Sequence, residues 1–81
     1  MKEEILKEED YLKSTDIALC SALRCYNYQI EAIDKQNINK VVFLIRRGDE
    51  IDHLIKLFFS HELKVDALSY FNFLKEFVNI I

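Results

Sequence analysis

The strongest apolar run in the chain lies near its middle, over residues 40–46. Lysine and arginine bracket five consecutive apolar residues, Val41-Val42-Phe43-Leu44-Ile45, most of which are β-branched or aromatic. A short run that is apolar on both faces is typical of a central strand. Before it, residues 28–35 alternate in polarity, and residues 36–39 have the composition of a turn. The pattern predicts a β-hairpin built from these two strands.

A helical period replaces the alternation in three stretches, at about residues 16–26, 49–60 and 67–80. In the second stretch the apolar residues follow the i, i+3, i+4, i+7 spacing of one helix face: Ile51, Leu54, Ile55 and Phe58. The first stretch is apolar with few charges, which predicts a well-buried helix. The last stretch is also apolar over much of its circumference. We therefore expect three helices packed on the hairpin.

Each predicted helix follows an acidic residue that suits its N-terminus. Asp16, Asp49 and Asp66 stand at these positions, where a carboxylate accepts hydrogen bonds from free backbone N–H groups and complements the helix dipole. For the first helix, either Thr15 or Asp16 fits the cap position. The chain has one glycine and no proline. Asn27 is therefore expected to take the left-handed conformation that ends the first helix, because asparagine tolerates it when glycine is absent.

The remaining segments complete an α+β order. Residues 11–14 read as a short first strand, and residues 63–65 as a short fourth strand that is less certain to form. The order β-α-β-β-α-(β)-α predicts a small, mostly antiparallel sheet of three to four strands with three helices. Its first six elements match the split β-α-β order of ferredoxin-like folds. We expect a charged leader over residues 1–10 and one domain over residues 11–81.

Charge is concentrated in the predicted leader. Residues 1–10 carry two lysines and five acidic residues, so they account for the whole net charge of −3, and residues 11–81 are neutral. A neutral body differs from the broadly basic surface of a duplex-DNA binder. No apolar run approaches the length of a membrane span, and no secretory signal is visible, which predicts a cytoplasmic protein without a membrane partner.

The two cysteines, Cys20 and Cys25, stand five residues apart in the first predicted helix. At about 100° per residue they lie about 140° apart around the axis, which suits neither a disulfide nor a shared metal ion. We expect free, buried thiols in a reducing compartment.

Residues 11–81 share cap and core positions with a known group of short sequences: Tyr11, Ser14-Thr15-Asp16-Ile17, Leu19, Leu23, Asn27-Tyr28, Val41-Val42-Phe43, Phe58-Phe59 and Lys64-Val65-Asp66. On these positions the chain resembles a family of short uncharacterised proteins, a domain of unknown function from bacterial, plasmid and phage genomes. The chain departs from the family pattern at Asn27-Tyr28, where Gly-Phe is more frequent, and at Ala67, where proline is frequent. The resemblance implies a phage or mobile-element setting and no particular activity.

Candidate chemistry is sparse. Asp49 and His53 stand four residues apart on the second predicted helix, with Asp52 beside them and His61 two turns on. Converging ligands of this kind bind metals, but the solvated face of a helix collects the same residue types. No serine or cysteine nucleophile can be placed beside a histidine, and the lone Gly48 forms no phosphate loop. We predict no catalytic site, metal or cofactor, and a protein that is not an enzyme.

Excess apolar surface is the strongest functional signal. The second and last predicted helices are apolar over about 200° and 180°, whereas packing on one sheet face accounts for a stripe of about 100°. The residues expected to form a contact surface are Phe59, Phe73, Phe77 and Ile80. Packing in a deep groove within one chain would also cover them. We predict a protein-interaction module, which binds a larger protein complex or forms a homodimer.

An alternative function uses the basic residues of the predicted hairpin. The candidate residues are Tyr28, Lys35, Lys40, Arg46 and Arg47. Cations that follow phosphates and a ring that stacks on bases bind single-stranded nucleic acid. Charges that protect a strand end from edge pairing would have the same composition. Single-stranded nucleic acid is therefore the alternative partner that the sequence offers.

Overall fold

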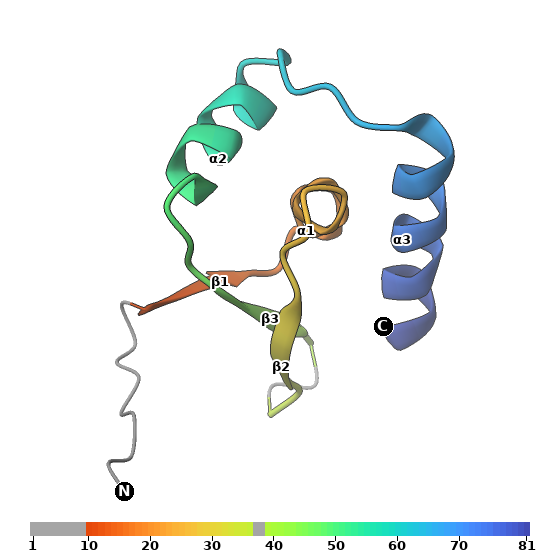
Figure 1. Cartoon of the computed structure of the whole chain (residues 1–81). Coiled ribbons are helices and arrows are strands. Elements are labelled where there is room, and N and C mark those ends of the chain that lie inside the picture. The colour runs from red at the N-terminus through yellow and green to blue at the C-terminus, as the bar shows by residue number, and fades with distance from the viewer. Residues whose placement is uncertain (1–9, 37–38) are drawn as a thin grey trace, which may run out of the picture.

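The computed structural model describes residues 10–36 and 39–81, which form three strands and three helices (Figure 1). The elements in chain order are β1 (Tyr11–Ser14), α1 (Ile17–Arg24), β2 (Ile30–Asp34), β3 (Val42–Arg46), α2 (Ile51–Phe59) and α3 (Ala67–Ile80). The predicted α+β class and the three helices are confirmed. The predicted leader lies, except for Asp10, outside the described residues.

The sheet has the strand order β1-β3-β2, with β3 antiparallel to both neighbours. β3 is therefore the central strand, as its continuous apolar run predicts. Its Phe43 and Ile45 side chains are fully buried, and its register places Ile45 opposite Leu12 of β1 and Ile30 of β2. β1, α1 and β2 thus form a split β-α-β unit with β3 inserted between the two parallel strands.

The fourth strand does not form over residues 63–65 of the described chain, which have an irregular conformation. The backbone N–H groups of Glu62 and Leu63 both donate to the Leu57 carbonyl, at 2.9 and 3.1 Å. The Tyr26 hydroxyl donates to the Lys64 carbonyl. The end of α2 and the end of α1 therefore satisfy polar groups that a strand would have paired with a sheet edge.

Two of the three predicted N-caps are confirmed. The Asp16 carboxylate accepts from the N–H groups of Ala18 and Leu19, at 2.9 and 3.2 Å, and the Asp66 carboxylate accepts from that of Ser69 at 2.9 Å. The cap predicted at Asp49 is wrong. α2 begins one residue later, with Glu50 in the cap position and no side-chain hydrogen bond to the described helix start.

Among residues 10–36 and 39–81, two residues other than glycine take the left-handed conformation, and each ends a helix. Asn27 has φ 72° and His61 has φ 65°, so the prediction for Asn27 is confirmed. After α2, the Glu62 N–H donates to the Leu57 carbonyl and the His61 N–H donates to the Phe58 carbonyl at 3.2 Å. This pair of bonds is the Schellman motif, in which glycine is the preferred left-handed residue.

We expect His61→Gly to raise the free energy of unfolding by about 0.5–1 kcal/mol, because glycine removes the Cβ clash of the left-handed conformation. Asn27→Gly is the matched control and should gain less, since asparagine already tolerates this conformation. Urea denaturation of both variants measures the difference. A loss of stability in His61→Gly would contradict this explanation.

The core lies between the sheet and α1. Leu23, Phe43, Ile45, Ile51 and Cys20 are fully or almost fully buried. Figure 1 shows α1 end-on above the sheet, with α2 and α3 on its two sides. α1 packs against both helices, more extensively against α3. Each outer helix therefore covers one flank of α1 and keeps its far side towards solvent.

Candidate protein-interaction surface

Phe77 fixes the inward face of α3. Its side chain is 3% exposed, and its ring meets that of Phe43 edge-on, with centroids 4.9 Å apart and planes at 82°. Edge-to-face rings at this distance are a favourable aromatic pair. The prediction that Phe77 belongs to a contact surface is therefore wrong, because this residue ties α3 to the central strand.

A cation holds the neighbouring turn of α3. The Arg24 guanidinium lies 4.5 Å above the centre of the Phe73 ring, and it donates to the Tyr28 carbonyl and the Gln29 amide oxygen, at 3.3 and 2.9 Å. A guanidinium over a ring is attracted by the ring's negative face. Phe73 is half-buried under this group, so it faces α1 rather than solvent.

Ile80 also lies on the inward side. It lines a groove of about 220 Å³ between α3 and β2, together with Ile30, Ile33 and Phe77. Ile80 is half-buried and packs against the core, whereas Ile33 is 40% exposed. Three of the four residues predicted for the contact surface therefore face the body of the protein.

Phe59 is the one predicted contact residue that is mainly exposed. It is the last residue of α2, is 61% exposed, and meets Phe58 edge-on with centroids 5.1 Å apart. α1 lies between α2 and α3 (Figure 1). The four predicted residues consequently do not form one surface.

The opposite side of α3 carries the apolar surface that the prediction assigned to other residues. Leu68 is 69% exposed, Phe71 is 54% exposed and Val78 is 57% exposed. The Lys75 ammonium group lies 5.3 Å from the centre of the Phe71 ring. At about 100° per residue, Leu68, Phe71, Lys75 and Val78 span an arc of about 80°. We call these four residues the α3 outward face.

The α3 outward face is larger than scattered exposure explains. Single apolar residues on a surface are ordinary, but an aligned set on one helix is typical of a surface that another protein covers. Ile81, 68% exposed, extends the apolar area beyond the end of α3. The sequence already indicated an exposed apolar surface, because the apolar arc of this helix is wider than the stripe that packing against the body covers.

A hollow of about 290 Å³ lies where α1, α3 and the linker after α2 meet. Its lining is mostly apolar: Ala22, Phe58, His61, Leu63, Val65 and Tyr70. Burial, with the nearby Asp16 and Cys25, raises the pKa of Tyr70 above its ordinary value. The raised pKa keeps the Tyr70 hydroxyl protonated at neutral pH, so this hydroxyl is a poor nucleophile.

The acidic and histidine residues of α2 lie on its solvent side. The Arg47 guanidinium donates to the Asp52 carboxylate at 2.7 Å, and Asp52 is 84% exposed. His53 is exposed as well. Within residues 10–36 and 39–81, no three histidine, cysteine or acidic side chains are grouped so that they would hold a metal ion. The solvated ion pair between Arg47 and Asp52 contributes little to the free energy of folding.

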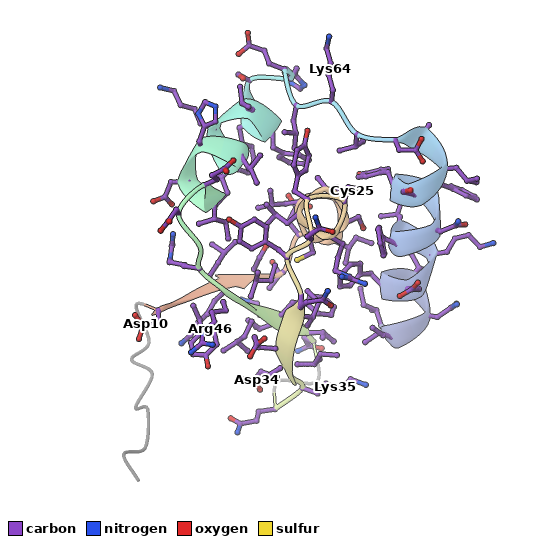
Figure 2. All side chains as sticks on the ribbon, viewed as in Figure 1. Asp10, Cys25, Asp34, Lys35, Arg46 and Lys64 are labelled. Carbon is purple, nitrogen blue, oxygen red and sulfur yellow. The ribbon has the colours of Figure 1, made fainter. Side chains whose placement is uncertain are left out.

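Both cysteines are free thiols, as expected, although only Cys20 is fully buried and Cys25 is half-buried. Figure 2 shows Cys25 at α1, on the side near the linker that carries Lys64. Burial raises the pKa of Cys20 to about 11, and burial together with Asp66 raises the pKa of Cys25. Both thiols are therefore protonated at neutral pH and are poor nucleophiles.

This shift predicts a loss of stability in alkali. Folding holds the Cys20 proton more tightly than the unfolded chain does, so its contribution is complete below pH 9 and is lost as the pH rises to about 11. Two pKa units correspond to about 2–3 kcal/mol. We expect the unfolding free energy of Cys20→Ala to fall less steeply across this window. If the unfolding free energies of the unmodified chain and of Cys20→Ala fall equally with pH, the loss in alkali does not come from Cys20.

The structure does not bring the predicted basic residues into one patch. Lys35 and Lys40 are exposed beside the β2–β3 turn, whereas Arg46 and Arg47 follow at the other end of β3. Lys40 and Arg46 are six residue steps apart along nearly extended backbone, which is about 20 Å. Figure 2 shows Lys35 with Asp34 at the turn and Arg46 near Asp10.

The aromatic member of that set is also engaged. The Tyr28 ring packs against Gly48, where an added Cβ would lie 2.8 Å from the Tyr28 hydroxyl oxygen. Tyr28 is half-buried and packs on the core. A ring held in this way supports the loop before α2, so it is a poor platform for an unstacked base.

Comparisons with protein-family models, curated proteins and solved structures give no match for this chain. Within the described part of the chain, no helix combines the length and the apolar character that crossing a membrane requires. The interpretation of function therefore depends on the surface itself.

Proposed function

We propose that this chain is a non-enzymatic protein-interaction module, which binds another protein through the α3 outward face. The observation that carries the proposal is the exposure of Leu68, Phe71 and Val78, each more than half exposed on one side of one helix. The phage or mobile-element setting is part of the same proposal and follows from the family resemblance alone.

The support for α3 as a contact helix is its rigid attachment. Phe77 anchors it to β3, and Arg24 covers Phe73 on the same inward side. A partner would therefore meet a helix whose backbone is already ordered, which lowers the entropy cost of binding. Apolar side chains on a fixed helix suit a helical or grooved protein surface.

Photo-crosslinking in the native host tests this proposal. A benzophenone-bearing phenylalanine analogue replaces Phe71 in the full chain, and a second variant carries it at Phe59, which is similarly exposed but lies on α2. We expect intermolecular protein adducts from position 71 at several times the yield from position 59. Adducts only within the chain, or equal yields from both positions, would contradict the proposal.

A further inference from the structure

The spacing of the α3 outward face is symmetric along the helix. Its members are separated by three, four and three residues, from Leu68 through Phe71 and Lys75 to Val78. This is the spacing of alternating a and d positions in a heptad, which form the seam between paired helices. Because the spacing reads the same from either end, a reversed copy of the helix presents its members at matching heights.

We infer that the partner of the α3 outward face is a second copy of this chain, with the two α3 helices antiparallel. This inference rests on the proposed function and names the partner of the same surface. In this arrangement Leu68 lies opposite Val78 of the partner subunit, and Phe71 lies opposite Lys75 of the partner subunit. Both contacts occur twice, as the two-fold axis requires.

The position of the lysine decides the orientation. In a parallel pair, Lys75 would lie against Lys75 of the partner subunit, with two like charges inside an apolar seam. In the antiparallel pair it lies against an aromatic ring instead. Its ammonium group is already 5.3 Å from the centre of its own Phe71 ring. The reversed copy adds a second ring, so the cation is held between two aromatic faces.

The remaining exposed residues agree with a short seam. α3 has 14 residues, which is about 21 Å of helix. Asn72 and Asn79 are exposed and flank the stripe on one side, and Ile81, 68% exposed, widens it on the other. A seam of four layers, two of which contain a lysine, forms a small interface. We therefore expect weak dimerisation that depends on protein concentration. Lys75 sets the orientation of the two helices and lowers the affinity of the dimer.

Register-specific disulfides test this inference in the full chain. Leu68→Cys and Val78→Cys are made separately with Cys25→Ala as the common background, and Cys20 remains because it is fully buried. The two proteins are oxidised singly and as a mixture. In the antiparallel pair, position 68 lies opposite position 78, whereas the two copies of position 68 are about 15 Å apart. A disulfide needs Cα atoms within about 7 Å.

The expected result is a covalent dimer that forms mainly between the two different variants in the mixture. Preferential disulfides within each single variant would show a parallel pair and overturn the inference. Sedimentation equilibrium of the unmodified chain supplies the second measurement, with a dimer expected at high concentration. A monomer up to millimolar concentration, with no disulfide in the mixture, would also overturn it.

Lys75→Leu tests the role assigned to the cation. An apolar residue in the same layer should tighten dimerisation about tenfold and allow disulfides within single variants, because the penalty on the parallel pair is removed. Weaker dimerisation with an unchanged disulfide pattern would overturn this role. If these tests fail but position 71 still crosslinks to a different protein, the proposed function stands and only the second-copy partner is lost. If that crosslink is absent too, both fail.

Discussion

Replacing Phe77 with alanine is expected to lower the free energy of unfolding by about 3–5 kcal/mol. The side chain is 3% exposed and contacts the Phe43 ring, so its removal leaves a cavity between α3 and the central strand. A domain of this size has a total stability of about 4–12 kcal/mol. The variant should therefore be largely or partly unfolded at 37 °C. Urea denaturation followed by far-ultraviolet circular dichroism measures the loss.

Phe71→Ala is the matched control for this prediction, because it removes the same side chain from the same helix. Phe71 is 54% exposed, and at concentrations where the protein is monomeric its removal should cost about 1 kcal/mol or less. Equal losses in the two variants would show that α3 does not have the orientation described above.

Phe71→Asp is expected to weaken dimerisation by about 100-fold or more while the fold is retained. The substitution removes two aromatic rings from the seam and places a carboxylate opposite Lys75 of the partner subunit. That ion pair offsets only part of the lost apolar burial and of the cost of desolvating both charges. Sedimentation equilibrium measures the dissociation constant, and circular dichroism measures the fold. Because Phe71 lies outside the core, thermal unfolding of the dilute variant should remain close to that of the unmodified chain.

Phe59→Asp is the control for surface charge in general. Phe59 is 61% exposed at the end of α2, so an aspartate there should leave the dimer intact. If Phe59→Asp disrupts dimerisation as strongly as Phe71→Asp, the contact surface is not confined to α3. If Phe71→Asp remains dimeric, the outward face is not the seam.

Much of the fold could be predicted from the sequence because its determinants are local. The five-residue apolar run predicts β3 as the central strand, and the structure assigns it over Val42–Arg46. Asp16 and Asp66 cap their helices, and Asn27 ends α1, because each position depends on the chemistry of one or two neighbouring turns. The α+β order follows from these elements.

The orientation of α3 could not be predicted in the same way. Its apolar residues cover about half of the circumference, so periodicity alone does not say which half faces the core. The structure decides this through contacts that are distant in sequence. Phe77 meets Phe43, and Arg24 covers Phe73. The residues left outside are Leu68, Phe71 and Val78, rather than the predicted Phe73, Phe77 and Ile80.

The absent fourth strand has a similar cause. Residues 63–65 have strand-like composition, but backbone groups in and beside this segment are already hydrogen-bonded to groups outside the sheet. The Leu57 carbonyl accepts from both Glu62 and Leu63, and the Tyr26 hydroxyl donates to the Lys64 carbonyl. Tyr26 is 38 positions away in sequence from Lys64, so no local pattern contains this contact.

The separation of the basic residues was, in contrast, available from the sequence. Lys40 and Arg46 bracket a single strand, and a strand of that length holds its ends about 20 Å apart. The basic composition of a hairpin therefore does not show that its basic residues lie close together, because each residue of a strand adds about 3.3 Å to its length. The three, four, three spacing on α3 is likewise present in the sequence, although its meaning depends on which side of the helix is exposed.

The most direct test of the account is the fluorescence of Phe71→Trp as the protein is diluted. The chain contains no tryptophan, so the single indole reports only on the α3 outward face. We predict solvent-exposed emission and strong acrylamide quenching in dilute solution. As the protein concentration rises, emission should shift to shorter wavelength and acrylamide quenching should fall. The midpoint of this change should match the dissociation constant of the dimer measured by sedimentation equilibrium. A buried indole in the monomer, or an exposed one up to millimolar concentration, would contradict the account.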